Sequence, residues 1–366
     1  MSNKTGSAPS ELTFSAIESG AGSDELLESV KQILTEGGSH NASVFSRQHW
    51  EWQYKNLPGK RSGVYTCAYE NKMAGYYHAP FYSGQINGER KLFAMVQDVA
   101  VNASLRGMGV FRKLAEYATD RLKSSGANLV YTFPNDKSIH TFLKYNGYHK
   151  VCSYDTFLLP VKCAKIIKSR FSLLGTEKLV GAMADIFFKR NYRLGQGEEV
   201  NVLPGFDENS ASFFNRFASS FPVSRIRDME YLKWRYSDKP AGKHVILALS
   251  SAGKMKAAAV FKQDEIFGVS AAILLDFAFE EEKDMAKLVH YVKENSQKIF
   301  EQQPALIFTA FCCAKFLRNK KYGFVKVPEK TNPRLVNLLV KNISEKEALV
   351  TDAANWFATL GDWDVF

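Results

Sequence analysis

The sequence predicts an α/β protein with two domains in tandem, and three observations lead to this fold class. The chain has 366 residues, which is long for a single α/β domain and sufficient for two. Strand-like and helix-like patterns of apolar residues follow one another through the N-terminal half. Several landmarks of that half return in the same order in the C-terminal half, as they do after a duplication.

Composition limits the classes of protein that the chain can represent. With 45% hydrophobic and 23% charged residues, it resembles an ordinary globular protein. The apolar run Val269–Leu275 is too short for a membrane span, and the polar first residues lack a hydrophobic export core. We therefore expect a cytoplasmic protein without a membrane partner. Five cysteines with no CxxC pair predict neither a disulfide framework nor a metal site, and the adjacent Cys312 and Cys313 are expected in the core.

The charge of the chain favours anionic partners. A formal net charge of +10 suits coenzyme A, nucleic acid or an acidic glycan. Basic residues are richest in Lys162–Arg193, where apolar residues lie between them. This pattern favours a helical connector with a solvated basic face over an RNA-binding surface, so a nucleic-acid partner is not expected. The sequence leaves the oligomeric state open.

The most informative segment is Val96–Phe111, which reads VQDVAVNASLRGMGVF. An apolar run typical of a buried strand ends in the turn Arg106–Gly109, and an amphipathic helix follows. Gly107 and Gly109 allow the backbone to curl so that successive N–H groups converge before the helix N-terminus, where Arg106 adds positive charge. Such a turn suits a diphosphate. The alternative is a glycine turn that serves chain geometry only.

The elements around this turn follow in a recognisable order. The predicted strands are Leu12–Glu18, Val64–Tyr69, Met73–Tyr82, the run from Val96, Ala127–Asn135 and Tyr148–Leu159, and the predicted helices are Asp24–Thr35, the one after Gly109, and Asp136–Gly147. With the glycine turn, this order resembles the GNAT acyltransferases over residues 10–160. The GNAT motif has Arg or Gln, two residues, Gly, one residue, then Gly or Ala. Arg106 and Gly109 match it, and Phe111 replaces the last small residue.

The resemblance implies a fold and a cofactor. Each copy is expected to be a mixed, largely antiparallel sheet flanked by helices, with acetyl-CoA as co-substrate. The strand that carries Val99–Val101 is expected to splay from the strand that carries Tyr131 and Phe133, which leaves a slot for the pantetheine arm. The implied cofactor-binding residues are Val99, Ala100, Val101, Arg106, Gly107, Met108, Gly109, Val110, Phe111 and Asn135.

Catalytic residues are less well defined by the resemblance. Asp98 is the first candidate for the proton acceptor, and its alternative role is that of a structural carboxylate. The tyrosine that usually acts as the acid in the family is replaced by Leu143. Tyr145 and Tyr131, followed by His140, are the substitutes that lie nearby.

Three aromatic residues, Trp50, Trp52 and Tyr54, precede the second strand. Such a group could line a sugar-binding face. Because Trp52 and Tyr54 recur as Trp234 and Tyr236, we assign the group to packing first.

The second copy lacks the glycine turn. Landmarks recur about 180 positions later, and the pairs are Trp52 with Trp234, Pro58 with Pro240, Asp98 with Asp276, Phe142–Lys144 with Phe316–Arg318, and Gly147 with Gly323. Shortly after Asp276, residues Phe279–Asp284 read FEEEKD, and their carboxylates repel phosphate at a helix N-terminus. The expected domains are 1–161 (cofactor-binding), 162–196 (basic connector) and 197–366 (degenerate copy). The final segment Trp356–Asp364 resembles that of bacterial tandem-GNAT proteins.

The function that these features favour is N-acetyl transfer. Acetyl-CoA would acetylate a primary amine of a small molecule or amino sugar, by direct attack in a ternary complex. Two alternatives remain: a Fem-type aminoacyl-tRNA-dependent transferase, and a CoA-binding regulatory module without turnover. The acceptor and the acyl chain length are not defined by the sequence.

Overall fold

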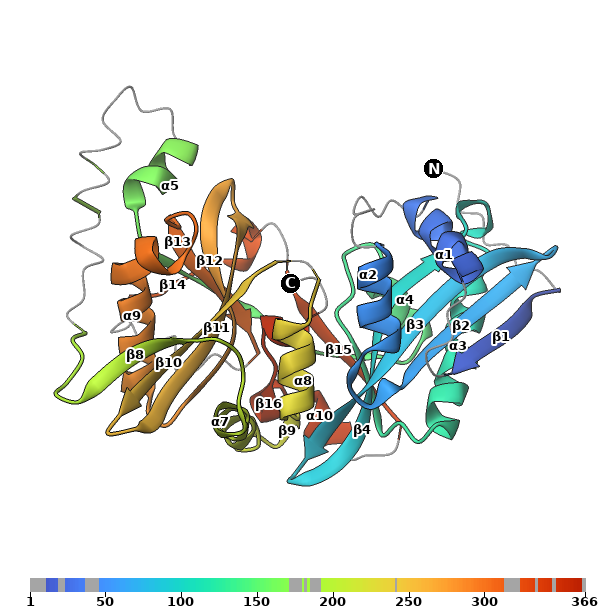
Figure 1. Ribbon diagram of the computed structural model, residues 1–366. Helices are drawn as coiled ribbons and strands as arrows, with labels where there is room; N and C mark the ends of the chain where they lie inside the picture. Colours follow the sequence, from blue (N-terminus) through green and yellow to red (C-terminus); the bar gives the residue numbers. More distant parts are fainter. Residues whose placement is uncertain are drawn as a thin grey trace. The chain divides into compact units, whose positions relative to one another are not determined.

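A computed structural model describes residues 11–18, 24–36, 46–170, 180, 183–184, 192–240, 242–312, 323–332, 335–343 and 347–363. The chain forms two compact units (Figure 1). The first unit comprises Met1–Ser153, Asp238–Ala241 and Val336–Asn355, and the second comprises Tyr154–Ser237, Gly242–Leu335 and Trp356–Phe366. Cys313, Phe316–Arg318, Asp364 and most of the expected connector 162–196 lie outside the described residues.

The first unit is a mixed sheet with helices on both faces. In spatial order its strands are β1 (Thr13–Glu18), β2 (Ser62–Tyr69), β3 (Lys72–Ile86), β4 (Glu89–Val101), β5 (Leu129–Thr132), β15 (Asn337–Asn342) and β6 (His149–Ser153). These neighbours pair antiparallel except β4 and β5, which are parallel. The helices are α1 (Asp24–Glu36), α2 (Arg47–Trp50), the π-helix η2 (Glu51–Lys55), α3 (Val110–Ser124), α4 (Ile139–Tyr145) and α10 (Glu347–Thr351), with 3₁₀ turns η3 (Pro58–Lys60), η4 (Ala103–Leu105) and η9 (Ala353–Asn355).

The second unit repeats this architecture. In spatial order its strands are β8 (Glu198–Leu203), β10 (His244–Ser251), β11 (Lys254–Ile266), β12 (Val269–Phe279), β13 (Leu306–Phe311), β7 (Asp155–Pro160) and β14 (Val325–Lys326), and β9 (Val223–Arg225) pairs with β16 (Trp356–Phe357). Here too one pair, β12 and β13, is parallel. The helices are α5 (Cys163–Arg170), α7 (Glu208–Ala218), α8 (Met229–Leu232), the π-helix η5 (Lys233–Ser237) and α9 (Glu282–Ile299), with 3₁₀ turns η8 (Glu329–Thr331) and η10 (Leu360–Asp362). The mixed, largely antiparallel sheets confirm the predicted fold class.

Each sheet contains one strand from the other half of the sequence. The sequence predicts a single strand over Tyr148–Leu159, but the chain forms two: β6 joins the first sheet and β7 the second. In return, β15 lies between β5 and β6 in the first sheet, at the position that β7 holds in the second. The compact units therefore differ from the expected contiguous domains, because a sheet is assembled by pairing and not by sequence order.

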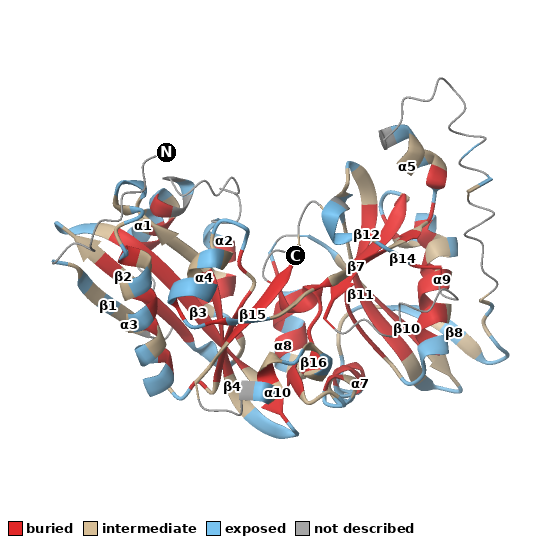
Figure 2. Cartoon of the chain, turned by 180° about the vertical axis from the view of Figure 1, so that it is seen from behind, coloured by how far each residue is buried: buried red, intermediate tan, exposed pale blue. Residues whose placement is uncertain are grey.

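Apolar faces fix the helices on the first sheet. In α3 the buried side chains are Val110, Leu114, Ala115, Ala118 and Leu122, at the spacing of one helical face. They pack with Tyr65 and Tyr77, whereas α1 packs with the neighbouring residues Val64 and Tyr76. Because consecutive strand residues point to opposite faces, α1 and α3 cover opposite sides of the sheet. Figure 2 shows the sheets as largely buried and the outer helix surfaces as exposed.

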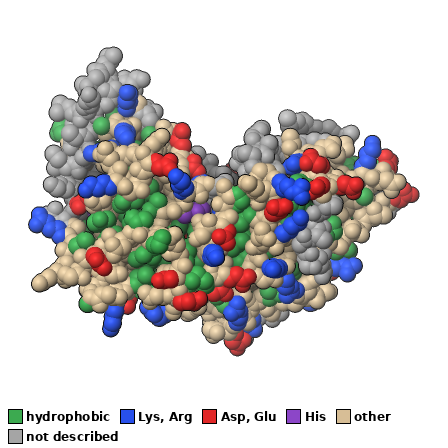
Figure 3. Space-filling model, viewed as in Figure 1, with side chains coloured by type: hydrophobic (Ala, Val, Ile, Leu, Met, Phe, Trp, Pro, Cys, Tyr) green, Lys and Arg blue, Asp and Glu red, His purple; other side chains and the backbone are tan. Residues whose placement is uncertain are grey.

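Membrane spans and metal sites can be assessed for the described residues. Among them, no helix is long and apolar enough to cross a membrane, and no group of three or more His, Cys, Asp or Glu side chains could hold a metal ion. On the face shown in Figure 3, basic and acidic side chains are interspersed.

Candidate active site in the first unit

The glycine turn connects β4 to α3 and presents unpaired amides. Gly107 and Gly109 have φ of 80° and 75°, in the left-handed region that glycine adopts without strain. Within the described residues, the N–H groups of Gly107 and Gly109 form no hydrogen bond, whereas the Met108 N–H donates to the Leu105 carbonyl at 3.3 Å. The first-turn amides of α3 add further donors, since no intrahelical acceptor exists for them. This end of α3 has the donors and the dipole that an anion requires.

The two parallel strands separate before they reach this turn. Pairing between β4 and β5 ends at Val96 and Thr132, where the Thr132 hydroxyl donates to the Val96 carbonyl at 3.0 Å. From there β4 continues to Val101, and within the described residues it pairs with β3 alone, on its other side. Val99–Val101 therefore line one edge of a fork whose base is the Val96–Thr132 pair. We call this opening the first fork.

Asp98 lies on the free part of β4 in an unusual backbone conformation. Its φ is 49°, at an irregularity in the register of β3 and β4 between Tyr76 and His78. A non-glycine residue in this region is strained, and such strain is concentrated at functional sites. The side chain is 19% exposed, so the carboxylate can reach an incoming group.

The two carboxylate oxygens of Asp98 have different surroundings. Oδ2 accepts hydrogen bonds from Gln53 Nε2 at 2.9 Å and from the Tyr54 hydroxyl at 3.3 Å. Oδ1 accepts no hydrogen bond from the described part of the chain. One oxygen is therefore anchored by neutral donors, and the other is available to accept a proton.

A buried histidine lies behind this carboxylate. His78 Nδ1 is 3.8 Å from Asp98 Oδ2, and the His78 ring stacks on Tyr54 with ring centroids 3.8 Å apart. Burial lowers the pKa of His78, although Asp98 acts in the opposite direction. Gln97 Nε2 can only donate, and it lies 3.2 Å from His78 Nδ1, so Nδ1 is the acceptor nitrogen of the ring. The ring proton is therefore on His78 Nε2, which donates to Ser62 Oγ at 2.6 Å. The imidazole is therefore neutral and does not neutralise Asp98.

The aromatic residues near Asp98 form a buried wall. Trp50, Trp52 and Tyr54 are at most 5% exposed, as the packing interpretation predicts. Trp50 stacks on Tyr54, whose hydroxyl contacts both the Tyr76 hydroxyl and Asp98. Burial, followed by Tyr76 and Asp98, raises the pKa of Tyr54 well above its ordinary value, so its hydroxyl stays protonated as a donor.

The remaining predicted residues lie in different settings. Tyr131 is buried on β5 and packs edge-on against Phe93 and Phe133. Tyr145 on α4 is 49% exposed, beneath the ammonium group of Lys144. Asn135 accepts backbone hydrogen bonds from Lys137 and Ser138, which gives it a structural role at the start of α4.

Other positions named from the sequence lie at the surface. His140 and Leu143 are exposed on α4, and Arg106 is exposed with its Nε 3.4 Å from the Val101 carbonyl. Leu143 has no hydroxyl, and within α4 the side chains that carry one are Thr141 and Tyr145.

Sequence reasoning missed Gln53, His78 and Tyr76 as neighbours of Asp98. A signal for Gln53 existed, because it stands between Trp52 and Tyr54, the two aromatic residues that recur. His78 and Tyr76 carry no comparable sequence signal. They meet Asp98 only through the pairing of β3 with β4.

The second unit closes the corresponding place with its own chain. Pairing of β12 and β13 ends at Ile273 and Phe308, and the Thr309 hydroxyl donates to the Leu274 carbonyl at 3.0 Å, as at the base of the first fork. Beyond it, Phe311 pairs with Thr359, and the Cys312 N–H donates to the Ala358 carbonyl at 2.9 Å. The C-terminal segment Trp356–Trp363 thus occupies this second fork.

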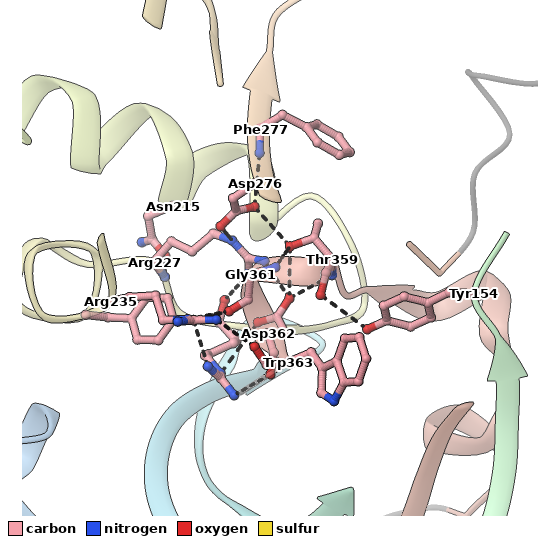
Figure 4. A network of polar contacts seen from close by, with 12 residues as sticks. Tyr154, Asn215, Arg227, Arg235, Asp276, Phe277, Thr359, Gly361, Asp362 and Trp363 are labelled. Carbon is pink, nitrogen blue, oxygen red and sulfur yellow. Dashed lines mark hydrogen bonds and ion pairs between the residues drawn. The ribbon is translucent and has the colours of Figure 1, made fainter. Parts of the chain in front are cut away.

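Asp276, the counterpart of Asp98, has both oxygens occupied (Figure 4). Oδ2 pairs with Arg227 Nε at 2.9 Å and accepts from the Tyr236 hydroxyl at 3.1 Å. Oδ1 accepts from the Phe277 N–H at 3.0 Å and from the Thr359 hydroxyl at 3.4 Å. Asp276 is fully buried. It is a structural ion-pair partner.

The start of α9 is acidic where the start of α3 has its glycine turn. Glu281 caps α9, and Glu282 and Asp284 lie in its first turn. These carboxylates already interact with the helix dipole. The anion-binding features are therefore confined to the first unit within the part of the chain that is described.

Comparisons with known proteins agree with this geometry. A family model described as an acetyltransferase (GNAT) domain matches residues 24–150. A search of curated proteins gave no match. The chain resembles a probable N-acyltransferase from Enterococcus faecalis V583 with a TM-score of 0.63 and 13% identity, over 91% of this chain and 73% of that one.

Two further structures extend the likeness. A GCN5-related N-acetyltransferase from Anabaena variabilis gives a TM-score of 0.61 at 11% identity, over 93% of this chain and 75% of that one. The N-myristoyltransferase of Saccharomyces cerevisiae with bound myristoyl-CoA gives a TM-score of 0.61 at 12% identity, over 98% of this chain and 92% of that one. At such identities the likeness shows the fold. Residues 24–150 thus match the model of a GNAT acetyltransferase domain, a family whose general activity is acyl-CoA-dependent acyl transfer.

Proposed function

We propose that this protein transfers an acetyl group from acetyl-CoA to a primary amine of a small molecule or an amino sugar. The observation that carries the proposal is the glycine turn, whose unpaired amides lie at the start of α3 where β4 has separated from β5. The amides of Gly107 and Gly109 suit a diphosphate, and Arg106 supplies positive charge. The backbone of Val99–Val101 has the extended form that an amide-containing pantetheine arm can pair with.

The residues present fit direct attack by the amine. Bound acetyl-CoA supplies an activated thioester carbonyl. Asp98 Oδ1 accepts a proton from the acceptor ammonium, and the nitrogen lone pair then attacks that carbonyl. The C–N bond forms as the C–S bond breaks, and the second nitrogen proton goes to the departing thiolate. Because Leu143 carries no hydroxyl, no side chain at that position assists departure.

The first experiment tests cofactor binding. Acetyl-CoA should raise the melting temperature of the protein, since a ligand of the native state stabilises it by mass action. Gly109→Glu or Arg106→Glu should remove this effect, because each places negative charge before α3. Glu281→Gln, at the start of α9 in the second unit, is the matched control and should keep the full shift. A melting curve that millimolar acetyl-CoA leaves unchanged would refute the cofactor.

The second experiment identifies the acceptor and the acyl group. The protein is incubated with labelled acetyl-CoA and with pooled amines, aminoglycans and nucleotide amino sugars, and the release of free CoA thiol is measured. Myristoyl-CoA is included because the yeast neighbour binds it. Faster turnover with myristoyl-CoA than with acetyl-CoA would show that the transferred acyl group is a long chain and not acetyl. Binding without thiol release would favour the regulatory module, which the hydroxyl-free Leu143 supports. Transfer from aminoacyl-tRNA would favour the Fem-type alternative.

A further inference from the structure

We propose that Gln53 is a positioning residue for Asp98, which it holds by one oxygen so that the other faces the acceptor amine. This inference rests on the proposed function, in which Asp98 is the proton acceptor. Gln53 is 6% exposed, and its Nε2 lies 2.9 Å from Asp98 Oδ2. Within the described residues its side chain forms no hydrogen bond with the glycine turn, so its effect on Asp98 can be measured apart from cofactor binding.

The π-helix η2 is what brings Gln53 to the carboxylate. Consecutive side chains point about 100° apart around an α-helix, yet Gln53 and Tyr54 both donate to Oδ2 of Asp98. The wider turn of η2 accommodates this pair, and π-turns of this kind occur frequently at functional sites. The stack of Trp50 on Tyr54 and of Tyr54 on His78 fixes the other side of the same turn.

The chemical nature of Gln53 suits a base that must stay basic. An amide donor anchors a carboxylate without neutralising its charge, whereas a guanidinium group would form an ion pair with the carboxylate and lower its proton affinity. In the second unit the guanidinium of Arg227 pairs with Asp276, and the equivalent π-helix η5 carries Arg235 at the position of Gln53. Arg235 donates to the carbonyls of Gly361 and Trp363 in the C-terminal segment. The long cationic side chain of Arg235 thus helps to hold the C-terminal segment in the second fork.

The anchoring also accounts for the strained backbone of Asp98. Its φ of 49° directs the side chain toward η2, and such a conformation persists only when surrounding contacts impose it. Asp276 is not among the described non-glycine residues with positive φ. The strain is therefore specific to the copy whose carboxylate keeps one oxygen open.

The test is the pH dependence of turnover in Gln53→Met, which keeps the length of the side chain and removes the donor. We expect kcat to fall about tenfold or more with little change in the KM for acetyl-CoA. The acidic limb of the rate profile should move to higher pH, because loss of a donor disfavours the charged carboxylate. Gln85→Met, at another buried glutamine of the first unit, is the matched control and should keep the wild-type profile.

A second variant and a second readout keep the inference falsifiable. Gln53→Glu has nearly the shape of glutamine and brings a second carboxyl to Asp98, so it should also move the limb to higher pH. Where no acceptor has been found, the titration of Asp98 is followed by ¹³C NMR of aspartate-labelled protein, with the same direction expected. A merely structural Gln53 would lower the melting temperature without shifting either titration.

The outcomes separate this inference from the proposed function. If Asp98→Asn abolishes turnover while both Gln53 variants keep the wild-type pH profile, Gln53 does not position the base and the proposed function stands. If Asp98→Asn retains turnover, Asp98 is not the proton acceptor and the inference fails with it. Profiles displaced in both Gln53 variants, with Gln85→Met unchanged, support the inference.

Discussion

Asp98 and Asp276 occupy equivalent places in the two units and have opposite surroundings. Each lies two residues beyond the strand residue whose carbonyl accepts a threonine hydroxyl, Val96 or Leu274. Each also accepts a hydrogen bond from the tyrosine of a π-helix, Tyr54 or Tyr236. Asp98 is strained, partly exposed and held by neutral donors on one oxygen. Asp276 is buried and held on both oxygens, with Arg227 as its counter-ion. One scaffold thus holds a carboxylate with one open oxygen and a carboxylate with both oxygens bonded.

The forks differ in the same sense. The first fork has no described chain segment paired with β4 beyond Val96 on the β5 side. The second fork is closed by Trp356–Trp363, where Gly361 is required because a Cβ there would overlap the Tyr236 hydroxyl. The unpaired strand edges of a fork require hydrogen-bond partners, which chain, ligand or water can supply. The comparison teaches that the second fork is filled by the C-terminal segment, whereas the first fork leaves a strand edge open within the described residues.

The largest expected effect breaks the assembly of the first unit. A fragment of residues 1–161 lacks β15, whose Leu338, Leu339 and Val340 are fully buried between β5 and β6. We expect this fragment to remain unfolded by circular dichroism. Residues 1–153 joined by a flexible linker to 336–355 should recover a cooperative thermal transition. A folded 1–161 fragment would show that the exchanged strand is dispensable.

The next effect concerns Asp98, the proposed proton acceptor. Asp98→Asn should lower turnover by a factor of about 10² to 10⁴, the usual contribution of a general base, with acetyl-CoA binding retained. Steady-state rates and the thermal shift with acetyl-CoA measure the two properties separately. Asp276→Asn should instead lower stability, because Arg227 would lose a charged partner in the core. Equal loss of turnover in both variants, at equal stability, would erase the distinction between the two carboxylates.

Arg227→Met should destabilise the protein by about 3–5 kcal/mol in urea denaturation, because it leaves the buried Asp276 without its counter-ion and Asp362 with Arg225 alone. Arg227 pairs with Asp276 and, through Nη2 at 2.8 Å, with Asp362. Burial alone would raise the pKa of Asp362, but Arg227 and Arg225 outweigh it and hold that pKa below its ordinary value. Lys243→Met, which breaks the exposed pair with Glu301, serves as the control and should change stability little. Equal effects of the two substitutions would contradict a structural role for the cluster.

The smallest effect tests a property that the two units share. Burial raises the pKa of Tyr148 in the first unit and of Tyr231 in the second. Above pH about 10 these groups ionise in the unfolded chain but not in the folded one. Stability should therefore fall as pH rises, by up to about 1.4 kcal/mol per pH unit for each tyrosine. Tyr148→Phe and Tyr231→Phe should each make the slope of unfolding free energy against pH shallower, and an unchanged slope would count against their burial.

Local signals explain the elements that were predicted well. The strand Leu12–Glu18 and the helix Asp24–Thr35 lie within one residue of β1 and α1, because alternation and helical periodicity act over a few residues. The glycine turn was also located correctly, since only glycine tolerates the φ values found at Gly107 and Gly109. Tyr148–Leu159 was predicted as one strand because its apolar pattern continues through Tyr154. Such a pattern contains no information on which sheet each part of the segment joins.

The amino-acid sequence by itself determined the local conformations, the duplication and the contrast between the glycine turn and the acidic start of α9. Each of these depends on residues that are close together in the chain or identical in type between the copies. Only the tertiary structure decided that β7 and β15 change sheets, that Trp356–Trp363 closes the second fork, and that Gln53 and His78 meet Asp98. Such contacts join residues far apart in sequence, and apolar periodicity specifies that a strand is buried without specifying its neighbour.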